Sequence, residues 1–418
     1  MGKFVMVQEN GRTTIGAPDK LFGVSSLAKA RIAEIGKEKV FDSTIGALMD
    51  DEGELIVLSS VVDVLKNLAP KDYAAYAPIS GVPAYLEAVK TAVFEDIETK
   101  GFVEACYAPG GTGALRNAIS CYTQMGDSIL TSDWHWGPYK VICAEQQRKV
   151  TTYTLFDEEG KFNQASFAEK LNGLLEVQDQ VLMIINTPAH NPTGYTFTLE
   201  DWDKVNEVLL SVSPEKNIIL VVDIAYLDFA GDAMEYRQFM KKLMDYPENI
   251  LPMYAFSASK GFTMYGMRCG ALVCVAPTAE IAKEFKDATS VASRASWSNG
   301  NRAAMETIAR IFNDAELKAK VTAERTEYVN MLRSRGAAFT EAANQVGLKS
   351  CPFDSGFFIT IPFESVDFAE AVGKELQKYE VFAVVLGAGV RVSIASLSEE
   401  KCKQVPGLII KAMEAVRG

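Results

Sequence analysis

The sequence predicts an α/β fold with two parts. One is a large domain whose mostly parallel, seven-stranded sheet lies between helices, and the other is a smaller α+β domain. Through the middle of the chain, short apolar runs alternate with segments of helical periodicity. This alternation ends where a long polar helix is expected, near residue 315. We therefore expect residues 1–50 to form an N-terminal arm and part of the small domain. Residues 51–315 are expected to form the large domain, and residues 316–418 the rest of the small domain.

The strands of the large sheet are expected at the apolar runs. Continuous runs of this kind, rather than alternating ones, are typical of strands that helices cover on both faces. Seven such runs occur, at residues 103–108, 128–131, 150–155, 181–186, 218–222, 251–256 and 271–276.

Helices are expected where apolar residues recur at a spacing of three to four. One of them begins with a capping box, because Thr198 is followed three residues later by Asp201. In the large domain these segments are residues 59–68, 82–99, 114–125, 167–176 and 199–211. The small domain is expected to contain helices at 315–335 and 367–379, a final helix, and strands at 356–362, 381–386 and 390–395. Near the N-terminus, Gly-Ala-Pro-Asp at residues 16–19 indicates an irregular arm.

Composition excludes several classes of function. The 418 residues carry a formal net charge of −12, which argues against nucleic acid or an anionic membrane as the main partner. No apolar stretch is long enough for a signal peptide or a membrane span. The seven cysteines form no Cys-x-x-Cys pair and most lie in apolar segments, so we expect reduced core residues. These features predict a cytoplasmic protein, and we expect no metal site.

A lysine stands at an unusual place in this pattern. Lys260 follows Ser257 and Ser259 between two apolar runs, so it is expected on a turn that joins two buried strands. A partly desolvated amine has a lowered pKa, which is what imine formation with a carbonyl requires. A surface lysine on a Ser/Gly loop is the alternative for this motif alone.

Three more of the predicted strands are followed by residues that can bind a ligand or take part in catalysis. In an open parallel sheet, ligands bind at the carboxyl ends of the strands. Gly111 and Thr112 follow the first strand in a Gly-rich turn that opens a helix, where free N–H groups can bind phosphate. Asn191 lies in a turn after residues 181–186, and the acid Asp223 follows five apolar residues.

Residues on both sides of the lysine can bind a phosphate group. Arg268 and Ser257 can chelate a phosphate dianion beside Lys260. A lysine, a buried acid, a phosphate cup and side chains that hold an oxygen together match the needs of pyridoxal phosphate.

The order and spacing of these motifs resemble the fold type I aminotransferases, in particular the aspartate and aromatic aminotransferase group. The resemblance covers nearly the whole chain, from Ile45-Gly46 to the last domain. It is carried by Pro109-Gly-Gly-Thr-Gly-Ala-Leu-Arg116, Asn191-Pro-Thr-Gly, Asp223-x-x-Tyr226, Ser257-x-Ser-Lys260, Arg268-x-Gly270, Arg294-Ala-Ser-Trp-Ser-Asn299, Val390-Arg391-Val-Ser-Ile, and Tyr76 followed by Gly81-Val-Pro83.

The resemblance implies a role for each matching residue. Lys260 would form the imine with pyridoxal phosphate and then act as the base at the substrate Cα. Asp223 would keep the pyridine nitrogen protonated, while Tyr226 and Asn191 hold the phenolate oxygen. Trp136 would stack on the ring, although Trp134 is close enough to be an alternative. The remaining implied contacts are with the phosphate (Gly111, Thr112, Ser257, Arg268, and Tyr76 from a second subunit) and the substrate (Arg391, Asn191, Gly46, and Arg294 from the neighbour).

The chain departs from the family pattern around the buried acid. Where the aspartate group has a histidine three residues after the stacking tryptophan, this sequence has Tyr139, and a second family histidine is replaced by Asn186. Pro138 also replaces a polar residue near the ring, and a structural role is expected for His190. The surroundings of Asp223 are therefore rebuilt, which affects the tuning of the ring nitrogen.

These observations predict a homodimeric aminotransferase that moves an amino group from a dicarboxylic or aromatic L-amino acid to a 2-oxo acid. 2-Oxoglutarate is the expected acceptor, in a ping-pong cycle. A decarboxylase or β-lyase on the same scaffold is an alternative. A ligand-sensing protein without turnover is another, and the acidic chain without a basic helix-turn-helix segment argues against it.

Overall fold

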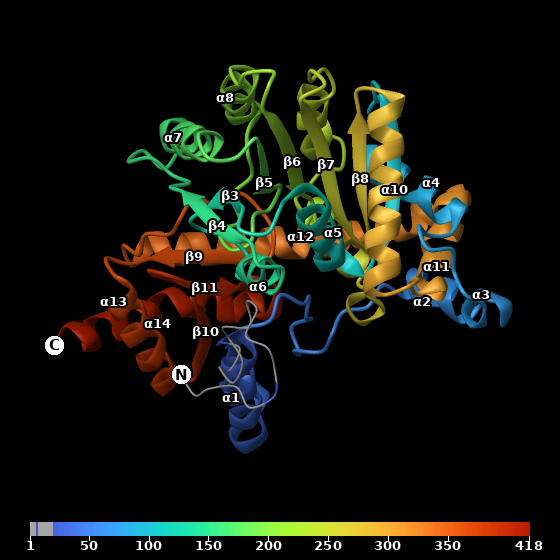
Figure 1. Ribbon diagram of the computed structural model, residues 1–418. Coiled ribbons are helices and arrows are strands. Elements are labelled where there is room, and N and C mark those ends of the chain that lie inside the picture. The colour runs from blue at the N-terminus through green and yellow to red at the C-terminus, as the bar shows by residue number, and fades with distance from the viewer. Residues whose placement is uncertain (1–5, 7–19) are drawn as a thin grey trace.

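The computed structural model describes residue 6 and residues 20–418, and its main feature is a seven-stranded sheet (Figure 1). The strand order is β2-β8-β7-β6-β5-β3-β4. Only β8 runs antiparallel to its neighbours, so the expected mostly parallel sheet is confirmed. The strands are β2 (Phe102–Ala108), β3 (Ser128–Ser132), β4 (Lys149–Tyr153), β5 (Gln180–Asn186), β6 (Asn217–Asp223), β7 (Ile250–Ser257) and β8 (Gly270–Ala276).

Helices cover both faces of this sheet. Alternate residues of β7 point to opposite cores, with Tyr254 in one and Met253 in the other. The first core is closed by α4 (Pro83–Phe94), α7 (Gln164–Leu175), α8 (Leu199–Leu210) and α11 (Arg302–Asn313). The second is closed by α5 (Gly110–Tyr122), α6 (Pro138–Glu145) and α10 (Ala279–Ser296).

Most of the predicted helix ends lie within four residues of the observed ones, and the capping box is present. Two ends are wrong: the helix expected at 315–335 continues to Gln345, and the helix expected at 82–99 already ends at Phe94. The Thr198 hydroxyl accepts from the Asp201 backbone N–H, and the Asp201 carboxylate accepts from the Thr198 N–H. Helices α6, α10 and α11 were not expected from the sequence.

A second, four-stranded sheet forms the smaller part of the molecule. Its order is β1-β10-β11-β9, and it packs with α12, α13 and α14 around a separate core. The elements are β1 (Phe41–Ser43), β9 (Phe358–Pro362), β10 (Val381–Val385), β11 (Gly389–Ser393), α12 (Ala315–Gln345), α13 (Val366–Leu376) and α14 (Glu399–Arg417). Because β1 pairs with β10, the N-terminal segment joins the C-terminal one in space.

The N-terminal segment is more regular than expected. Residues 20–35 form helix α1 (Lys20–Ile35), which contacts β10, where the sequence indicated only an irregular arm. The Gly-Ala-Pro-Asp turn at residues 16–19 lies outside the described residues. The short helices α2 (Ser59–Lys66) and α3 (Lys71–Ala74) follow.

The long helix α12 connects the two parts. It packs on α14 of the smaller part and on α2 and α11 of the larger one. A hydrophobic cluster that includes Leu48, Tyr226, Phe357 and Phe358 joins residues of the two parts. Within the described ranges, no helix is long and apolar enough to cross a membrane, and all seven cysteines are free thiols.

Candidate active site

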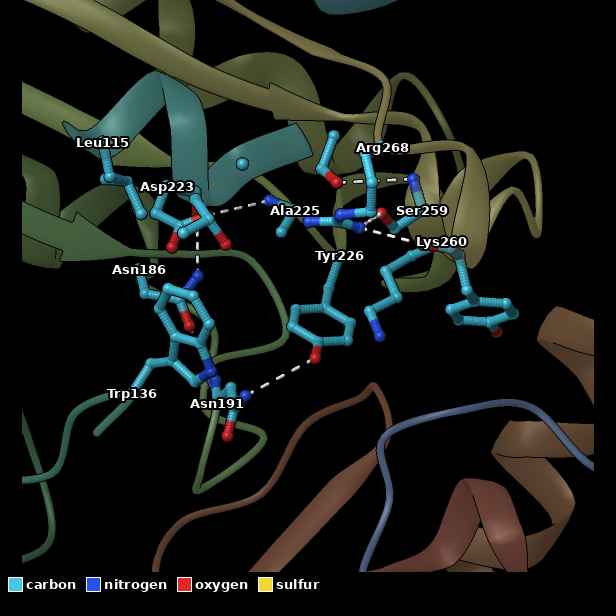
Figure 2. A pocket seen from close by; sticks show the side chains of 14 residues that line it. Leu115, Trp136, Asn186, Asn191, Asp223, Ala225, Tyr226, Ser259, Lys260 and Arg268 are labelled. Atoms are coloured by element: carbon cyan, nitrogen blue, oxygen red, sulfur yellow. Dashed lines mark hydrogen bonds between the residues drawn. The ribbon is translucent and has the colours of Figure 1, made fainter. Parts of the chain in front are cut away.

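A cavity opens at the carboxyl ends of β5, β6 and β7, where the two sheets face each other. It encloses about 230 Å³, which exceeds the ~150 Å³ of a protein cavity that takes up benzene. Figure 2 shows Asp223 and Trp136 toward one side of it, Lys260 and Arg268 toward the other, and Tyr226 between them. Its lining residues are Gly111, Thr112, Leu115, Trp136, Asn186, Asn191, Asp223, Ala225, Tyr226, Ser257, Ser259, Lys260, Tyr265 and Arg268.

Lys260 lies in a one-turn helix, α9 (Ala258–Gly261), between β7 and β8. Its ammonium donates to the Gly46 carbonyl, and Nζ lies 4.8 Å from the centre of the Tyr265 ring and 5.5 Å from that of Tyr226. Burial, followed by repulsion from the Arg391 and Arg268 guanidinium groups, lowers the pKa of Lys260 to about 7. A large fraction of this amine is therefore neutral and nucleophilic near neutral pH.

The first turn of α5 and the loop after Lys260 form an anion cradle. Arg268 takes a left-handed backbone conformation, with φ of +50°, and its Nη1 donates to Ser259 Oγ at 3.0 Å and to the Tyr265 carbonyl at 2.9 Å. Gly110 has a φ of +73°, a conformation that favours glycine, and a Cβ there would lie 2.6 Å from Arg268 Nη2 and displace the guanidinium. Free N–H groups of the helix N-terminus, Thr112, the two serines and Arg268 suit a phosphate dianion.

Asp223 ends β6 and is buried. Its Oδ2 accepts from the Tyr139 hydroxyl at 2.6 Å, and its Oδ1 accepts from the Ala225 N–H at 3.2 Å. Burial raises the pKa of Asp223, and the hydrogen bonds from Tyr139 and Ala225 act in the opposite direction.

Asn186 links β6 to the turn after β5. Its side-chain amide donates to the Asp223 carbonyl at 2.7 Å, and its Oδ1 accepts from the Asn191 N–H at 2.7 Å. Asn191 in turn accepts a hydrogen bond from Arg391 Nη1 at 3.1 Å, and its Nδ2 lies 3.5 Å from the Tyr226 hydroxyl.

Arg391 reaches this network from β11 of the small sheet. It is buried, its Nη2 donates to the Thr44 carbonyl at 2.8 Å, and its guanidinium lies 4.2 Å from the centre of the Phe358 ring. Burial lowers the pKa of Arg391 to about 10. Its Nε has no hydrogen-bond partner among the described residues, so a donor remains free for an anionic ligand.

The structure brings most of the predicted site residues together. Nine of them line the cavity, while Gly46 and Arg391 contact lining residues directly. Tyr76, which is 87% exposed, and Arg294, which donates to Ser298 Oγ at 2.6 Å on the surface, stand apart from the cavity within one chain.

Of the two tryptophans considered for the ring face, Trp136 lines the cavity and Trp134 packs elsewhere. A Cβ on Gly389 would lie 2.7 Å from the indole of Trp134, so this side chain packs against the small sheet. His190, for which a structural role was expected, is buried, and its Nδ1 shares a hydrogen bond of 2.8 Å with Thr193 Oγ1. Burial, with a smaller effect of His135, lowers the pKa of His190 to about 3.

Several residues at the site were not singled out for it from the sequence. The Tyr265 ring lies next to Lys260 Nζ, and its hydroxyl accepts from the Leu48 N–H at 3.0 Å. Because Tyr265 stands between Lys260 and Arg268 in the sequence, it could have been predicted as a site residue. Phe357, whose ring centre is 5.7 Å from Lys260 Nζ, comes from the segment before β9. No local pattern connects Phe357 with the lysine.

The donor set fits pyridoxal phosphate. The Lys260 amine can react with the aldehyde of the cofactor, and the anion cradle can bind its phosphate. The buried carboxylate of Asp223 can pair with its ring nitrogen. The unused donor of Arg391 fits a substrate carboxylate.

The chain resembles known proteins along nearly all of its length. The family model for aminotransferases of class I and II matches residues 38–407. The cytoplasmic aspartate aminotransferase of Dictyostelium discoideum is 26% identical over 96% of this chain and 90% of its own length. The tyrosine aminotransferase of Klebsiella pneumoniae is 25% identical over 92% of this chain and 96% of its own.

Solved structures agree with these matches. An aminotransferase from Anaerococcus prevotii has a TM-score of 0.94 and 35% identity, covering 99% of this chain and 100% of that one. An aromatic-amino-acid aminotransferase from Burkholderia pseudomallei, covalently bound to pyridoxal phosphate, shares the fold with a TM-score of 0.79 and 21% identity, covering 97% and 100%. The chain therefore belongs to the class I and II aminotransferases, the pyridoxal-phosphate-dependent enzymes of fold type I.

Proposed function

We propose that this aminotransferase moves the amino group of a dicarboxylic or aromatic L-amino acid to a 2-oxo acid, with 2-oxoglutarate as the acceptor. The observation that carries the proposal is the buried Arg391, which keeps a free Nε donor beside Asn191. A planar guanidinium binds the carboxylate shared by all amino acids in a two-pronged fork. Similarity of the Arg294 segment to the family's side-chain carboxylate site supports a second acidic group on the substrate.

The chemistry is divided between cofactor and chain. When bound, pyridoxal phosphate supplies an aldehyde that takes up the amino group and a ring that accepts the electrons released at Cα. Lys260 supplies the amine that holds the cofactor and, once free, takes the proton from the substrate Cα. A pKa of about 7 suits it to both tasks at neutral pH.

The other residues position these two reactants. Asp223 stabilises a proton on the ring nitrogen, and Tyr226 with Asn191 holds the ring oxygen. Trp136 covers one face of the ring. Gly111, Thr112, Ser257 and Arg268 bind the phosphate, and Gly46 and Arg391 hold the substrate.

We also propose a homodimer in which Tyr76 and Arg294 complete the neighbour's site. Support comes from the exposed apolar residues of the segment that carries Tyr76: Leu55 is 49%, Val57 43% and Tyr73 57% exposed. A second copy of the chain would cover them. A cytoplasmic location is proposed on the sequence features and one cytoplasmic relative, while other relatives are mitochondrial or chloroplastic.

A donor panel tests the substrate class. The purified holoenzyme is assayed with L-aspartate, L-glutamate, L-tyrosine and L-phenylalanine against 2-oxoglutarate. Arg294→Leu should lower kcat/KM for the dicarboxylic donors by about 30-fold or more, since losing one partner of a charge pair costs at least about 2 kcal/mol. Aromatic donors should lose little, and Arg417→Leu at the far end of α14 is the control. Absence of turnover with all four donors contradicts the proposal.

Mixing an inactive variant with one that is impaired toward dicarboxylic donors tests the shared site. Arg294→Leu and Lys260→Ala chains, unfolded and refolded together, would form hybrid dimers in which one site has both native residues. About a quarter of the native activity with a dicarboxylic donor should return, because half of the dimers are hybrids with one good site of two. If no activity returns while hybrids are detected, Arg294 does not act across the interface.

A further inference from the structure

Tyr139 occupies the position that a histidine holds in the aspartate group, and its surroundings give it a defined task. It is the second residue of α6, directly after Pro138, and its N–H donates to the Trp136 carbonyl at 3.0 Å. This turn places Trp136 at the cavity wall and sends the phenol of Tyr139 beneath it into the core, where its side chain is fully buried.

The phenol makes one strong contact. Its hydroxyl lies 2.6 Å from Asp223 Oδ2, within the ~2.5–2.7 Å range of an O–H donor bound to a carboxylate. Bonds of this kind are about twice as strong as those between neutral groups. Burial also raises the pKa of Tyr139 well above its ordinary value, so the hydroxyl keeps its proton and remains a donor. Asp223 Oδ1 is held separately by the Ala225 N–H.

Two neighbouring rings fix the phenol in place. The Trp136 ring meets it edge-on at a centroid distance of 5.6 Å, and the His135 ring stacks on it at 6.3 Å with an interplanar angle of 11°. His135 uses its Nδ1 for the Ser132 and Asp133 carbonyls rather than for the phenol. The hydroxyl is thus presented to Asp223 by packing that does not depend on the hydrogen bond itself.

We propose that Tyr139 is a positioning residue, whose neutral hydroxyl holds Asp223 as an oriented carboxylate and so keeps the ring nitrogen of the bound cofactor protonated. This inference rests on the proposed role of Asp223. It assigns to a phenol the task that the family gives to an imidazole. An imidazole has a second ring nitrogen that can bind another group, whereas the phenol has one O–H, which Tyr139 donates to Asp223. Tyr139 therefore has no second donor with which to extend the hydrogen-bond chain.

The test reads the ring nitrogen directly. Apoprotein is loaded with pyridoxal phosphate labelled with ¹⁵N in the ring, and its ¹⁵N NMR shift at pH 7.5 reports whether that nitrogen carries a proton. Tyr139→Phe removes only the hydroxyl. Tyr254→Phe is the matched control, because Tyr254 is also fully buried and its hydroxyl has no partner in the described part of the chain. Tyr139→His restores a donor of the family type.

The expected result is a protonated nitrogen in the native protein and in Tyr254→Phe, and a resonance moved toward the unprotonated position in Tyr139→Phe. The same variant should lose about 10- to 100-fold in kcat/KM, and Tyr139→His should recover the native resonance. An unchanged resonance in Tyr139→Phe, or a shifted one in Tyr139→His, overturns the inference. An unprotonated nitrogen in the native protein overturns the role of Asp223 as well. The choice of amino donor has no influence on this spectrum, so failure of the substrate proposal is seen separately in the donor panel.

Discussion

Replacing Asp228 by asparagine should destabilise the protein strongly, although Asp228 lies outside the cavity. Its Oδ1 lies 3.1 Å from Arg237 Nη2 and its Oδ2 lies 3.4 Å from Arg325 Nη1. The Arg237 side chain is 1% exposed, and the other two are 12% exposed. The cluster also supports the catalytic turn, because Arg325 donates to the Gly261 carbonyl at 3.2 Å, directly after Lys260.

The size of the effect follows from burial. Removing one partner of a buried ion pair costs about 3–5 kcal/mol, because the remaining charge is left uncompensated. Arg237 keeps hydrogen bonds to the Val93, Ala92 and Ala233 carbonyls, so we expect the lower end, about 3 kcal/mol. The unfolding entropy is about 2.1 cal/mol/K per residue, or roughly 0.9 kcal/mol/K for 418 residues, which converts this loss into a Tm lower by about 3 °C.

Calorimetry of the apoprotein at one protein concentration and pH 7.5 measures this shift. The control is Asp245→Asn, whose ion pair with Lys100 is exposed by 69% and 63%, and which should change stability by less than about 1 kcal/mol. Although burial alone would raise it, the pKa of Asp228 is held below its ordinary value of 3.8 by Arg325 and Arg237. The extra stability that Asp228 gives over asparagine should therefore be fully present above pH 3.8. It should disappear as the pH falls through the lower pKa that Asp228 has in the folded protein. Equal Tm shifts for the two variants at pH 7.5 would refute the reasoning.

Two further outcomes are expected. Arg391→Lys should raise KM for every amino donor by about 10-fold or more, because an ammonium cannot replace the fork that joins Asn191, Thr44 and a carboxylate; an unchanged KM in steady-state assays would contradict this. Since the pKa of Lys260 falls from 10.5 to about 7 on folding, the unfolded chain binds more protons between these values, and the apoprotein should become more stable as the pH rises from 7 to 10. Urea unfolding should show that the free energy of unfolding rises less steeply with pH in Lys260→Met than in the native protein. If it rises equally steeply in both, the pKa of Lys260 in the folded protein lies near its ordinary value.

The sequence was informative about the large sheet because its strands are buried on both faces. Runs such as residues 218–222 contain no polar residue, so their extent is visible directly in the sequence. Helix α10 escaped prediction because its 18 residues are mostly polar or small and present few apolar side chains to the core. The first turn of α5 was also missed, since glycines 110 and 111 are weak helix formers. Gly110 also has a φ of +73°, which few other residues adopt.

Site residues were predictable from their own surroundings where a strand end carried them. Arg391 of the small sheet was found only through the resemblance to the family. Lys260, Asp223 and Asn191 each follow an apolar run, which is a local signal. Phe357 reaches Lys260 across nearly a hundred residues of chain, and its sequence surroundings hold no sign of that contact. Tyr139 was noticed only as a departure from the family, because the partner of its hydroxyl lies 84 residues away.

The pairing register of β5, β6 and β7 explains why residues at their ends lie close together. In the parallel pairs, Asn186 of β5 stands beside Asp223 of β6, which stands beside Ala255 of β7. Side chains alternate between the faces of a sheet, so a slip of one residue in β6 would turn Asp223 away from Tyr139 and bring a valine in its place. The long apolar runs hold this register on both faces at once. The hydrophobic core of the strands thus sets the position of Asp223 relative to Tyr139, and it also sets the position of Ser257, which ends β7 beside the anion cradle.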